Sequence, residues 1–269
     1  MKKILVPTDF SENANNALRY AINIANYFEA EVNLVNVYEV RSTTGSFKSI
    51  EEYMREDAER DLSDSIRAVK TSLLGRTVLK GRAIKGNTID VICSIAENEK
   101  MDLIVMGTQG ASGLKEIFLG SKTSGVMKNT HIPILAIPNG FDYRPIKDIV
   151  FSVDSGIVAD SDVLQPLIKL ARSYKSNIKV VHLETEKVVA GFDPGIEYFL
   201  EDIPHTFHTV AGSSDINGVV NLFTYEENAD MLCMIRRERG FWSKLFHRSV
   251  TTKEIFDSPV PLLVLHSRD

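Results

Sequence analysis

Glycine and serine residues with phosphate-binding spacing follow a short apolar run in the first half of the chain. Residues 103–106 (LIVM) precede Gly107 and Gly110, and Gly120 and Ser121 come nine residues after Gly110. Glycine allows positive φ angles and close approach of the backbone to a ligand. A helix start adds free N–H groups and the positive end of a dipole. This pattern predicts a phosphate-binding loop; the alternative is a tight strand-to-helix turn that uses glycine for geometry alone.

Polar residues at the ends of two other apolar runs are expected near this loop. Residues 3–7 (KILVP) predict a strand buried on both faces, and Asp9 follows its end. Residues 32–37 (VNLVNV) predict a second strand that ends at Val37. Ligands of open parallel sheets bind beyond the carboxyl ends of the strands, where the strand order reverses. We therefore expect Asp9, Val37 and Gly107 to converge on one crevice.

The residues that usually carry catalysis or metal binding do not form a recognisable set. The glycine motif has neither a Walker-type lysine nor paired carboxylates, and the six histidines are scattered. On a strand, His205 and His208 would face opposite sides, so no metal pair is expected. The two cysteines, Cys93 and Cys233, can form neither a disulfide framework nor a four-ligand zinc site, and each is expected to be a small buried apolar residue.

The overall composition is typical of a soluble globular protein with two domains. The chain has 269 residues, of which 43% are hydrophobic and 25% are charged. A net charge of -5 argues against a general nucleic-acid binder. The first residues lack an apolar signal segment, and no apolar run approaches the ~20 residues that span a bilayer. The expected location is cytoplasmic, with no membrane partner.

Apolar runs alternate with amphipathic segments through the first half. Strands are expected at residues 3–7, 32–37, 76–84, 102–106 and 133–137, and helices at 13–28, 49–74, 88–98 and 121–129. Ser11 is expected to cap the first helix, and Ser49 with Glu52 to form a capping box for the second. This alternation predicts a parallel sheet with helices on both faces.

The pattern restarts after residues 139–145, which are a linker by their glycine and proline content. Residues 147–153 repeat residues 2–8 with an offset of 145 (147 − 2). Near the carboxyl end, residues 230–234 repeat residues 102–106 with an offset of 128 (230 − 102). The offset shrinks because the middle of the second copy is shorter.

The predicted fold class is therefore α/β. We expect two tandem open parallel five-stranded sheets with helices on both faces, in a Rossmann-like arrangement. The first domain is expected at residues 1–139, and a degenerate, shortened repeat of it at residues 146–269.

The glycine motif is absent from the second copy. With the offset of 128, the matched pairs are Gly107 and Ile235, Gly110 and Glu238, and Gly120 and Arg248. Side chains at these positions would fill the space of a phosphate, and a glutamate would repel it. Only the first domain is therefore expected to keep a nucleotide site, while the second acts as a structural or partner-facing half. An anion site on Arg236, Arg237 and Arg239 is the alternative to a solvated charge run.

Two motifs of the first copy resemble the universal stress protein family: PTDFS at residues 7–11, and M-G-x2-G-x9-G-S at residues 106–121. The resemblance covers nearly the whole chain as a tandem pair, although the second copy matches by strand pattern and Asp154 only. Family members with the glycine motif bind ATP, and those without it generally do not. The resemblance thus implies a stress-response protein that binds ATP or another adenine nucleotide in its first domain.

The resemblance also implies a role for each matching residue. The residues implied to contact adenine and ribose are Pro7, Thr8, Asp9, Val37, Met106 and Gly107. The residues implied to hold the phosphates are Gly110, Gly120, Ser121 and Thr123. Lys122 stands where the family commonly has a small apolar residue, and it would either add charge at a phosphate or point to solvent.

Our main hypothesis is a nucleotide-binding module whose ATP-bound state biases its shape or its partners. One alternative is a weak ATPase or nucleotidyl-transfer enzyme in which Asp9 helps to hold Mg²⁺ or a water; another is a scaffold that uses no nucleotide. Family domains pair through the edge of their fifth strand. The resemblance therefore implies that residues 133–137 and 261–265 pair within one chain, which would hide two strand edges. Whether two chains also form a homodimer stays open.

Overall fold

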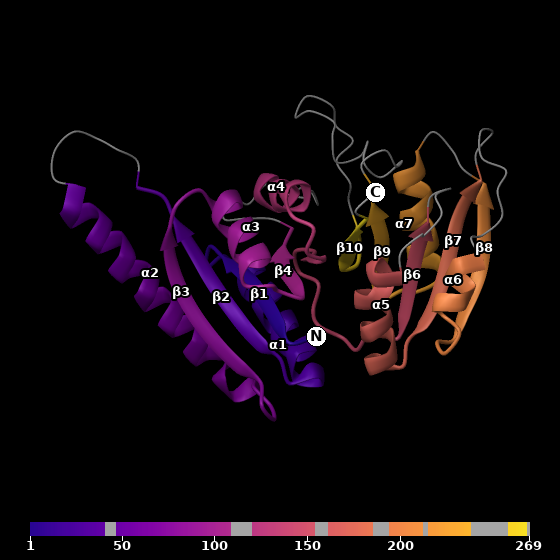
Figure 1. Ribbon diagram of the computed structural model, residues 1–269, viewed down its shortest axis with the longest axis horizontal. Helices are drawn as coiled ribbons and strands as arrows, with labels where there is room; N and C mark the ends of the chain where they lie inside the picture. Colours follow the sequence, from indigo (N-terminus) through magenta and orange to yellow (C-terminus); the bar gives the residue numbers. More distant parts are fainter. Residues whose placement is uncertain are drawn as a thin grey trace.

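Strands and helices alternate through both halves of the computed structural model (Figure 1). The structure describes residues 1–40, 47–108, 120–153, 161–184, 194–211, 215–237 and 258–267. The first half contains β1 (Lys3–Thr8), α1 (Glu12–Phe28), β2 (Glu31–Tyr38), α2 (Phe47–Val69), η1 (Lys70–Ser72), β3 (Val78–Lys85), α3 (Thr88–Asn98), β4 (Leu103–Gly107), α4 (Ser121–Asn129) and β5 (Ile134–Ile137). The second half contains β6 (Asp148–Val153), α5 (Ser161–Tyr174), β7 (Asn177–Glu184), α6 (Pro194–Phe199), β8 (His205–Ala211), α7 (Ile216–Glu226), β9 (Met231–Arg236) and β10 (Leu262–His266).

The strands form one continuous sheet in the order β3-β2-β1-β4-β5-β10-β9-β6-β7-β8. Neighbouring strands are parallel within each half, and both halves use the same order from the outer edge inward. The halves meet where β5 and β10 pair antiparallel, with Leu135 opposite Leu263. The predicted α/β fold with two five-stranded parallel sets is confirmed. The two sets join into one sheet because each would otherwise leave an apolar strand edge unpaired.

Two apolar layers cover the two faces of this sheet. The first layer contains buried residues of α1 and α5, and the second contains buried residues of α3, α4 and α7. Side chains alternate between the layers along each strand, so that Leu263 of β10 joins the first layer and Leu262 joins the second. Each layer includes residues of both halves, so the seam between β5 and β10 is part of the core. Cys93 and Cys233 are both buried, as predicted.

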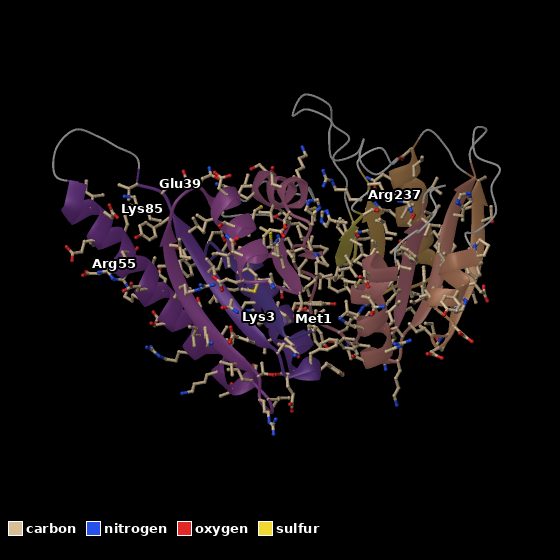
Figure 2. All side chains as sticks on the ribbon, in the orientation of Figure 1. Met1, Lys3, Glu39, Arg55, Lys85 and Arg237 are labelled. Atoms are coloured by element: carbon tan, nitrogen blue, oxygen red, sulfur yellow. The ribbon has the colours of Figure 1, made fainter. Side chains whose placement is uncertain are left out.

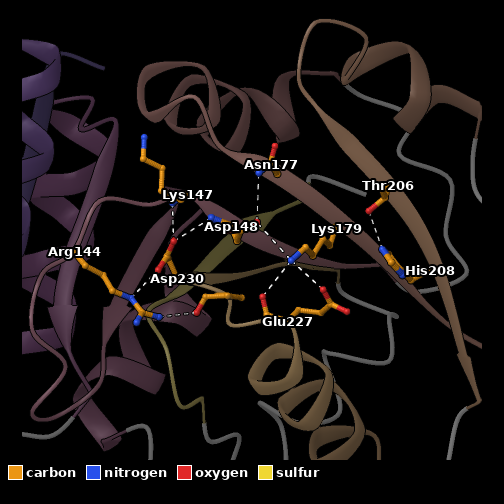
Figure 3. Close-up of polar contacts among 10 residues, drawn as sticks. Arg144, Lys147, Asp148, Asn177, Lys179, Thr206, His208, Glu227 and Asp230 are labelled. Carbon is orange, nitrogen blue, oxygen red and sulfur yellow. Dashed lines mark hydrogen bonds and ion pairs between the residues drawn. The ribbon is translucent and has the colours of Figure 1, made fainter.

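Repeated hydrogen bonds anchor the fourth strand of each half to the first, and Figure 3 shows those of the second half. A carboxylate oxygen of Asp102 accepts the N–H groups of residues 2 and 3, at 2.5 and 2.9 Å. Its counterpart Asp230 accepts the N–H groups of residues 147 and 148, at 2.7 and 3.0 Å. Arg144 adds an ion pair to Asp230 at 2.7 Å. The internal repeat is therefore preserved in individual contacts as well as in strand order.

The connector between the halves is fastened to helices on both sides of the seam. The side-chain amide of Asn16 on α1 donates to the carbonyl oxygen of Phe141 at 2.8 Å. The Tyr143 ring packs edge-on against Tyr20 with centroids 5.0 Å apart, and its hydroxyl donates to the hydroxyl of Tyr174 on α5 at 3.2 Å. Burial raises the pKa of Tyr20 and Tyr174. The connector is therefore a packed part of the fold.

Helix bounds agree with the sequence pattern in some places and differ in others. Ser11 caps α1 by accepting the N–H of Ala14, as predicted. The capping box at Ser49 is wrong, because α2 already begins at Phe47. This helix has a narrow apolar stripe and packs beside β3 at one edge of the sheet (Figure 1).

No helix of the described ranges is both long enough and apolar enough to cross a bilayer.

Candidate functional site

A pocket of about 320 Å³ opens at the carboxyl ends of β1, β2 and β4. β1 lies between β2 and β4, which is where the strand order of the first half reverses. The lining residues are Pro7, Thr8, Asp9, Ala14, Val35, Val37, Thr88, Met106, Gly107, Gly120, Ser121, Lys122 and Thr123. The structure thus brings together all the predicted site residues that it describes. Gly110 and Asp154 lie outside the described residues.

The floor of the pocket is apolar and comes from the sheet. Pro7 and Val35 are buried, Met106 is 5% exposed, and Val37 is half-buried. The buried side-chain amide of Asn36 donates to the carbonyl oxygen of Thr8 at 2.9 Å, which fixes the ends of β1 and β2 relative to each other. A flat apolar group can therefore lie against a preformed surface.

Asp9 stands at the mouth of the pocket on a short turn between β1 and α1. Its carboxylate accepts the N–H of Ser11 at 3.1 Å, and the hydroxyl of Thr8 accepts the N–H of Phe10 at 3.0 Å. Phe10 has a φ of 62°, in the left-handed region that residues other than glycine rarely adopt. Side-chain hydrogen bonds hold such turns in shape. Asp9 is exposed, so it both supports the turn and presents a carboxylate to the pocket.

Gly107 lies in a crowded place and does not have the positive φ that glycine would allow. Its φ lies outside the left-handed region. A Cβ at this position would lie 2.2 Å from the side-chain oxygen of Asn13. Asn13 is 5% exposed, and its amide has no hydrogen-bond partner among the described residues. A side chain at residue 107 would therefore require Asn13 to move.

The helix α4 points its amino end into the pocket. Its N-cap is Gly120, with an ordinary φ of −57°, and no side chain of the described residues caps the first turn. N–H groups of an uncapped first turn are free to bind an anion. The hydroxyl of Thr123, 3% exposed, donates to the carbonyl oxygen of Gly107 at 2.8 Å. Thr123 thus ties α4 to β4, and its single O–H proton is already used there.

Lys122 reaches across the mouth of the pocket. Its ammonium group donates to the hydroxyl of Thr88 at 3.1 Å and lies 3.8 Å from the carboxylate of Glu39. The Lys122 side chain therefore has two partners at the pocket, while its role at a phosphate or in solvent stays a prediction. Thr88 is a lining residue that the sequence motifs did not indicate, because it belongs to the first turn of α3.

Sequence comparisons match the half of the chain that contains this pocket. The model of the universal stress protein family matches residues 1–138. The chain is 36% identical over 141 residues to the universal stress protein MJ0531 of Methanocaldococcus jannaschii, covering 51% of this chain and 81% of that protein. The chain belongs to the universal stress protein family. A second universal stress protein of that organism, MJ0577, is 33% identical over 153 residues, which cover 94% of its length.

Comparison with solved structures extends the universal stress protein fold to both halves. The crystal structure of a universal stress protein from Archaeoglobus fulgidus matches 99% of this chain and 97% of its own, with a TM-score of 0.73. Sequence identity is 20%, so the likeness concerns the fold. The fold match therefore includes the second half of this universal stress protein.

The second half has a packed side chain where the first half has Gly107. Ile235 pairs with Leu265 in β10, just as Gly107 pairs with Ile137 in β5. Ile235 is 4% exposed, so its side chain is buried; that it fills the space of a phosphate stays a prediction. Glu238, Arg239 and Arg248 lie outside the described residues, and Arg236 and Arg237 are partly buried.

His205 and His208 lie on opposite faces of β8, as predicted. The imidazole of His205 is 3.7 Å from the carboxylate of Glu197 on α6, and the ring of His208 packs against Phe223 on α7 at 5.2 Å. Within the described ranges, no group of three or more metal-binding side chains forms.

Proposed function

We propose that this universal stress protein binds an adenine nucleotide, with ATP as the first candidate, in the pocket of its first half. We infer further that it acts as a binding module and that the nucleotide biases its shape or its partners in a stress response. One observation carries the proposal: a single pocket joins an apolar floor to an uncapped helix amino end that carries Ser121 and Lys122.

The two ends of the pocket suit the two ends of a nucleotide. The apolar floor at Pro7, Val35 and Met106 suits a flat base, and the Asp9 carboxylate can accept hydrogen bonds from ribose hydroxyls. The amino end of α4 and the ammonium group of Lys122 suit phosphates. A pocket of about 320 Å³ is at the small end of the ~300–1,000 Å³ typical of ligand sites.

The lining residues favour binding over catalysis. Among the described lining residues, Asp9 is the one carboxylate, and neither histidine nor cysteine accompanies it. A general base paired with a positioned partner is the usual requirement for hydrolysis. Mg²⁺, if it accompanies the phosphates, would find its protein ligand at Asp9, since hard cations prefer carboxylate oxygens.

We propose that the chain divides into domains at residues 1–139 and 146–269, with nucleotide binding restricted to the first. Ile235 in place of glycine supports this asymmetry. The antiparallel β5–β10 contact supports the idea that the tandem chain reproduces internally a pairing that family members make between two chains.

Calorimetric titration and mass spectrometry of co-purified ligands test the nucleotide proposal. We expect one adenine nucleotide per chain, and a stabilisation on the order of 2.7 kcal/mol at a hundredfold excess of ligand over its dissociation constant. Asp9→Ala should weaken binding, whereas Asp61→Ala, an exposed aspartate on α2, should not. Absence of binding at millimolar ATP, ADP and AMP would contradict the proposal. Steady phosphate release that is lost in Asp9→Ala would instead indicate a weak ATPase.

A further inference from the structure

We propose that Lys122 determines selectivity for the number of phosphates on the nucleotide. We propose also that Glu39 pairs with Lys122 while no nucleotide is bound and competes with the phosphates for its charge. The inference rests on the proposed function and deepens it. Lys122 would contribute little to binding of a nucleoside and progressively more to binding of the mono-, di- and triphosphate.

Three separate elements position this group. Lys122 belongs to the first turn of α4, Thr88 is the first residue of α3, and Glu39 follows the carboxyl end of β2. Lys122 and Thr88 both line the pocket. The ammonium group therefore has contacts with the start of α3 and with a carboxylate that follows the end of β2.

The contact between Lys122 and Glu39 is weak enough to be replaced by a phosphate. The two groups are 3.8 Å apart, with 55% and 40% of their side chains exposed. Exposed ion pairs of this kind contribute roughly 0–1 kcal/mol. A nucleoside triphosphate at the same helix end carries several negative charges, and the flexible lysine side chain can turn toward it at low cost. Lys122 can thus leave the Glu39 carboxylate and pair with the more highly charged phosphates.

A neighbouring lysine shows the contrast. Lys85, at the end of β3, lies 2.6 Å from the carboxylate of Glu51 on α2, so its charge is closely paired. Lys85 and Glu39 both lie near the same end of the sheet in Figure 2. Lys85 does not line the pocket within the described residues, whereas Lys122 does. Of these two lysines, Lys122 is the one with a loose partner and access to the site.

The test compares affinities for adenosine, AMP, ADP and ATP in the full-length protein by calorimetric titration. In Lys122→Met we expect ATP affinity to fall about tenfold, a change of about 1.4 kcal/mol, with a smaller loss for AMP and none for adenosine. Lys122→Arg should retain most of the preference. Lys128→Met removes the same charge from the last turn of α4 and should leave all four affinities unchanged.

Glu39→Gln tests whether Glu39 competes with the phosphates for Lys122. We expect ATP affinity to rise about threefold in the wild-type background, because the competing carboxylate is gone, and to rise less when Lys122 is already methionine. A ratio of ATP to AMP affinity that is the same in wild type and Lys122→Met would overturn the inference while leaving the nucleotide site intact. If the wild-type protein binds neither adenosine nor ATP, the proposed function and this inference both fail.

Discussion

The two halves differ most clearly at the end of their fourth strands, where the backbone pairing is the same. Gly107 in β4 and Ile235 in β9 occupy matched positions opposite Ile137 and Leu265. In the first half, Asn13 lies where a Cβ would be, and a pocket opens beside it. In the second half, the isoleucine side chain is itself buried. The same pairing of strands therefore lies beside a pocket in one half and beside a buried isoleucine in the other.

Features that hold the fold together do not show this divergence. Asp102 and Asp230 make the same pair of hydrogen bonds to the start of the first strand in each half. The comparison teaches that the contacts joining the first and fourth strands are repeated in both halves, whereas the residues at the ends of β4 and β9 differ.

The largest expected effect comes from copying the residue of the second half into the first. Gly107→Ile places a branched side chain against Asn13, so we expect the free energy of unfolding to fall by about 3 kcal/mol. We also expect ATP affinity to fall more than about 100-fold, a loss of at least ~2.7 kcal/mol. Chemical denaturation and calorimetric titration measure the two effects.

Two further variants separate crowding from other causes. Gly107→Ala combined with Asn13→Ala should be more stable than Gly107→Ala alone, because the crowding oxygen is removed. The reverse swap, Ile235→Gly, should destabilise the second half without creating a nucleotide site there. Equal stability of the single and double alanine variants would show that Asn13 is not the reason for glycine.

A smaller expected effect concerns the pH dependence of the unfolding free energy. At the seam, His266 of β10 is the counterpart of Pro138 after β5 (266 − 128). His266 is 7% exposed, and within the described chain neither of its ring nitrogens has a hydrogen-bond partner. Burial, with Arg236 and His131 nearby, lowers the pKa of His266 to about 3. The unfolded chain therefore binds more protons between pH 3 and the ordinary histidine pKa of about 6.5.

Stability should consequently rise with pH through this window and be lost as the pH falls. The His266 contribution amounts to about 2 kcal/mol between pH 7 and pH 5. Denaturation at several pH values should show that His266→Phe reduces this slope. An unchanged slope in the variant would assign the pH dependence to other groups.

The smallest effects distinguish two hydroxyl residues of α4. Thr123→Val leaves the partly buried Gly107 carbonyl without the Thr123 donor, so we expect a loss of about 1 kcal/mol in unfolding free energy and little change in ATP affinity. Ser121→Ala should show the opposite pattern, with weaker ATP binding and unchanged stability. Parallel thermal denaturation and titration of both variants would reveal whether the two roles have been assigned the wrong way round.

The sequence predicts the strands of this protein well because most of them are buried on both faces. Uninterrupted apolar runs locate β1, β4 and β9 to within a residue or two, and α4 has the predicted bounds. Between residues 184 and 229 the pattern is weaker. The edge strand β8 (HTFHTVA) has pairs of polar residues between its apolar ones, and α7 exposes Leu222 and Tyr225, so neither carries a clear apolar stripe.

The candidate site was predictable where its residues directly follow strands. Asp9, Gly107 and Gly120 are found by spacing alone, since parallel strands bring their carboxyl ends together. Asn13, Thr88 and Glu39 were not predictable in this way. Their positions depend on how closely α1, α3 and β2 approach the loop, which is a property of the packed core and not of any local motif.

The antiparallel contact of β5 with β10 also has a consequence for solution behaviour. Two subunits that associate through such an edge separate on dilution, whereas these strands belong to one polypeptide and meet at a fixed effective concentration. Under the proposed function, with one nucleotide site in each chain, ligand saturation of the single chain would follow a simple hyperbola.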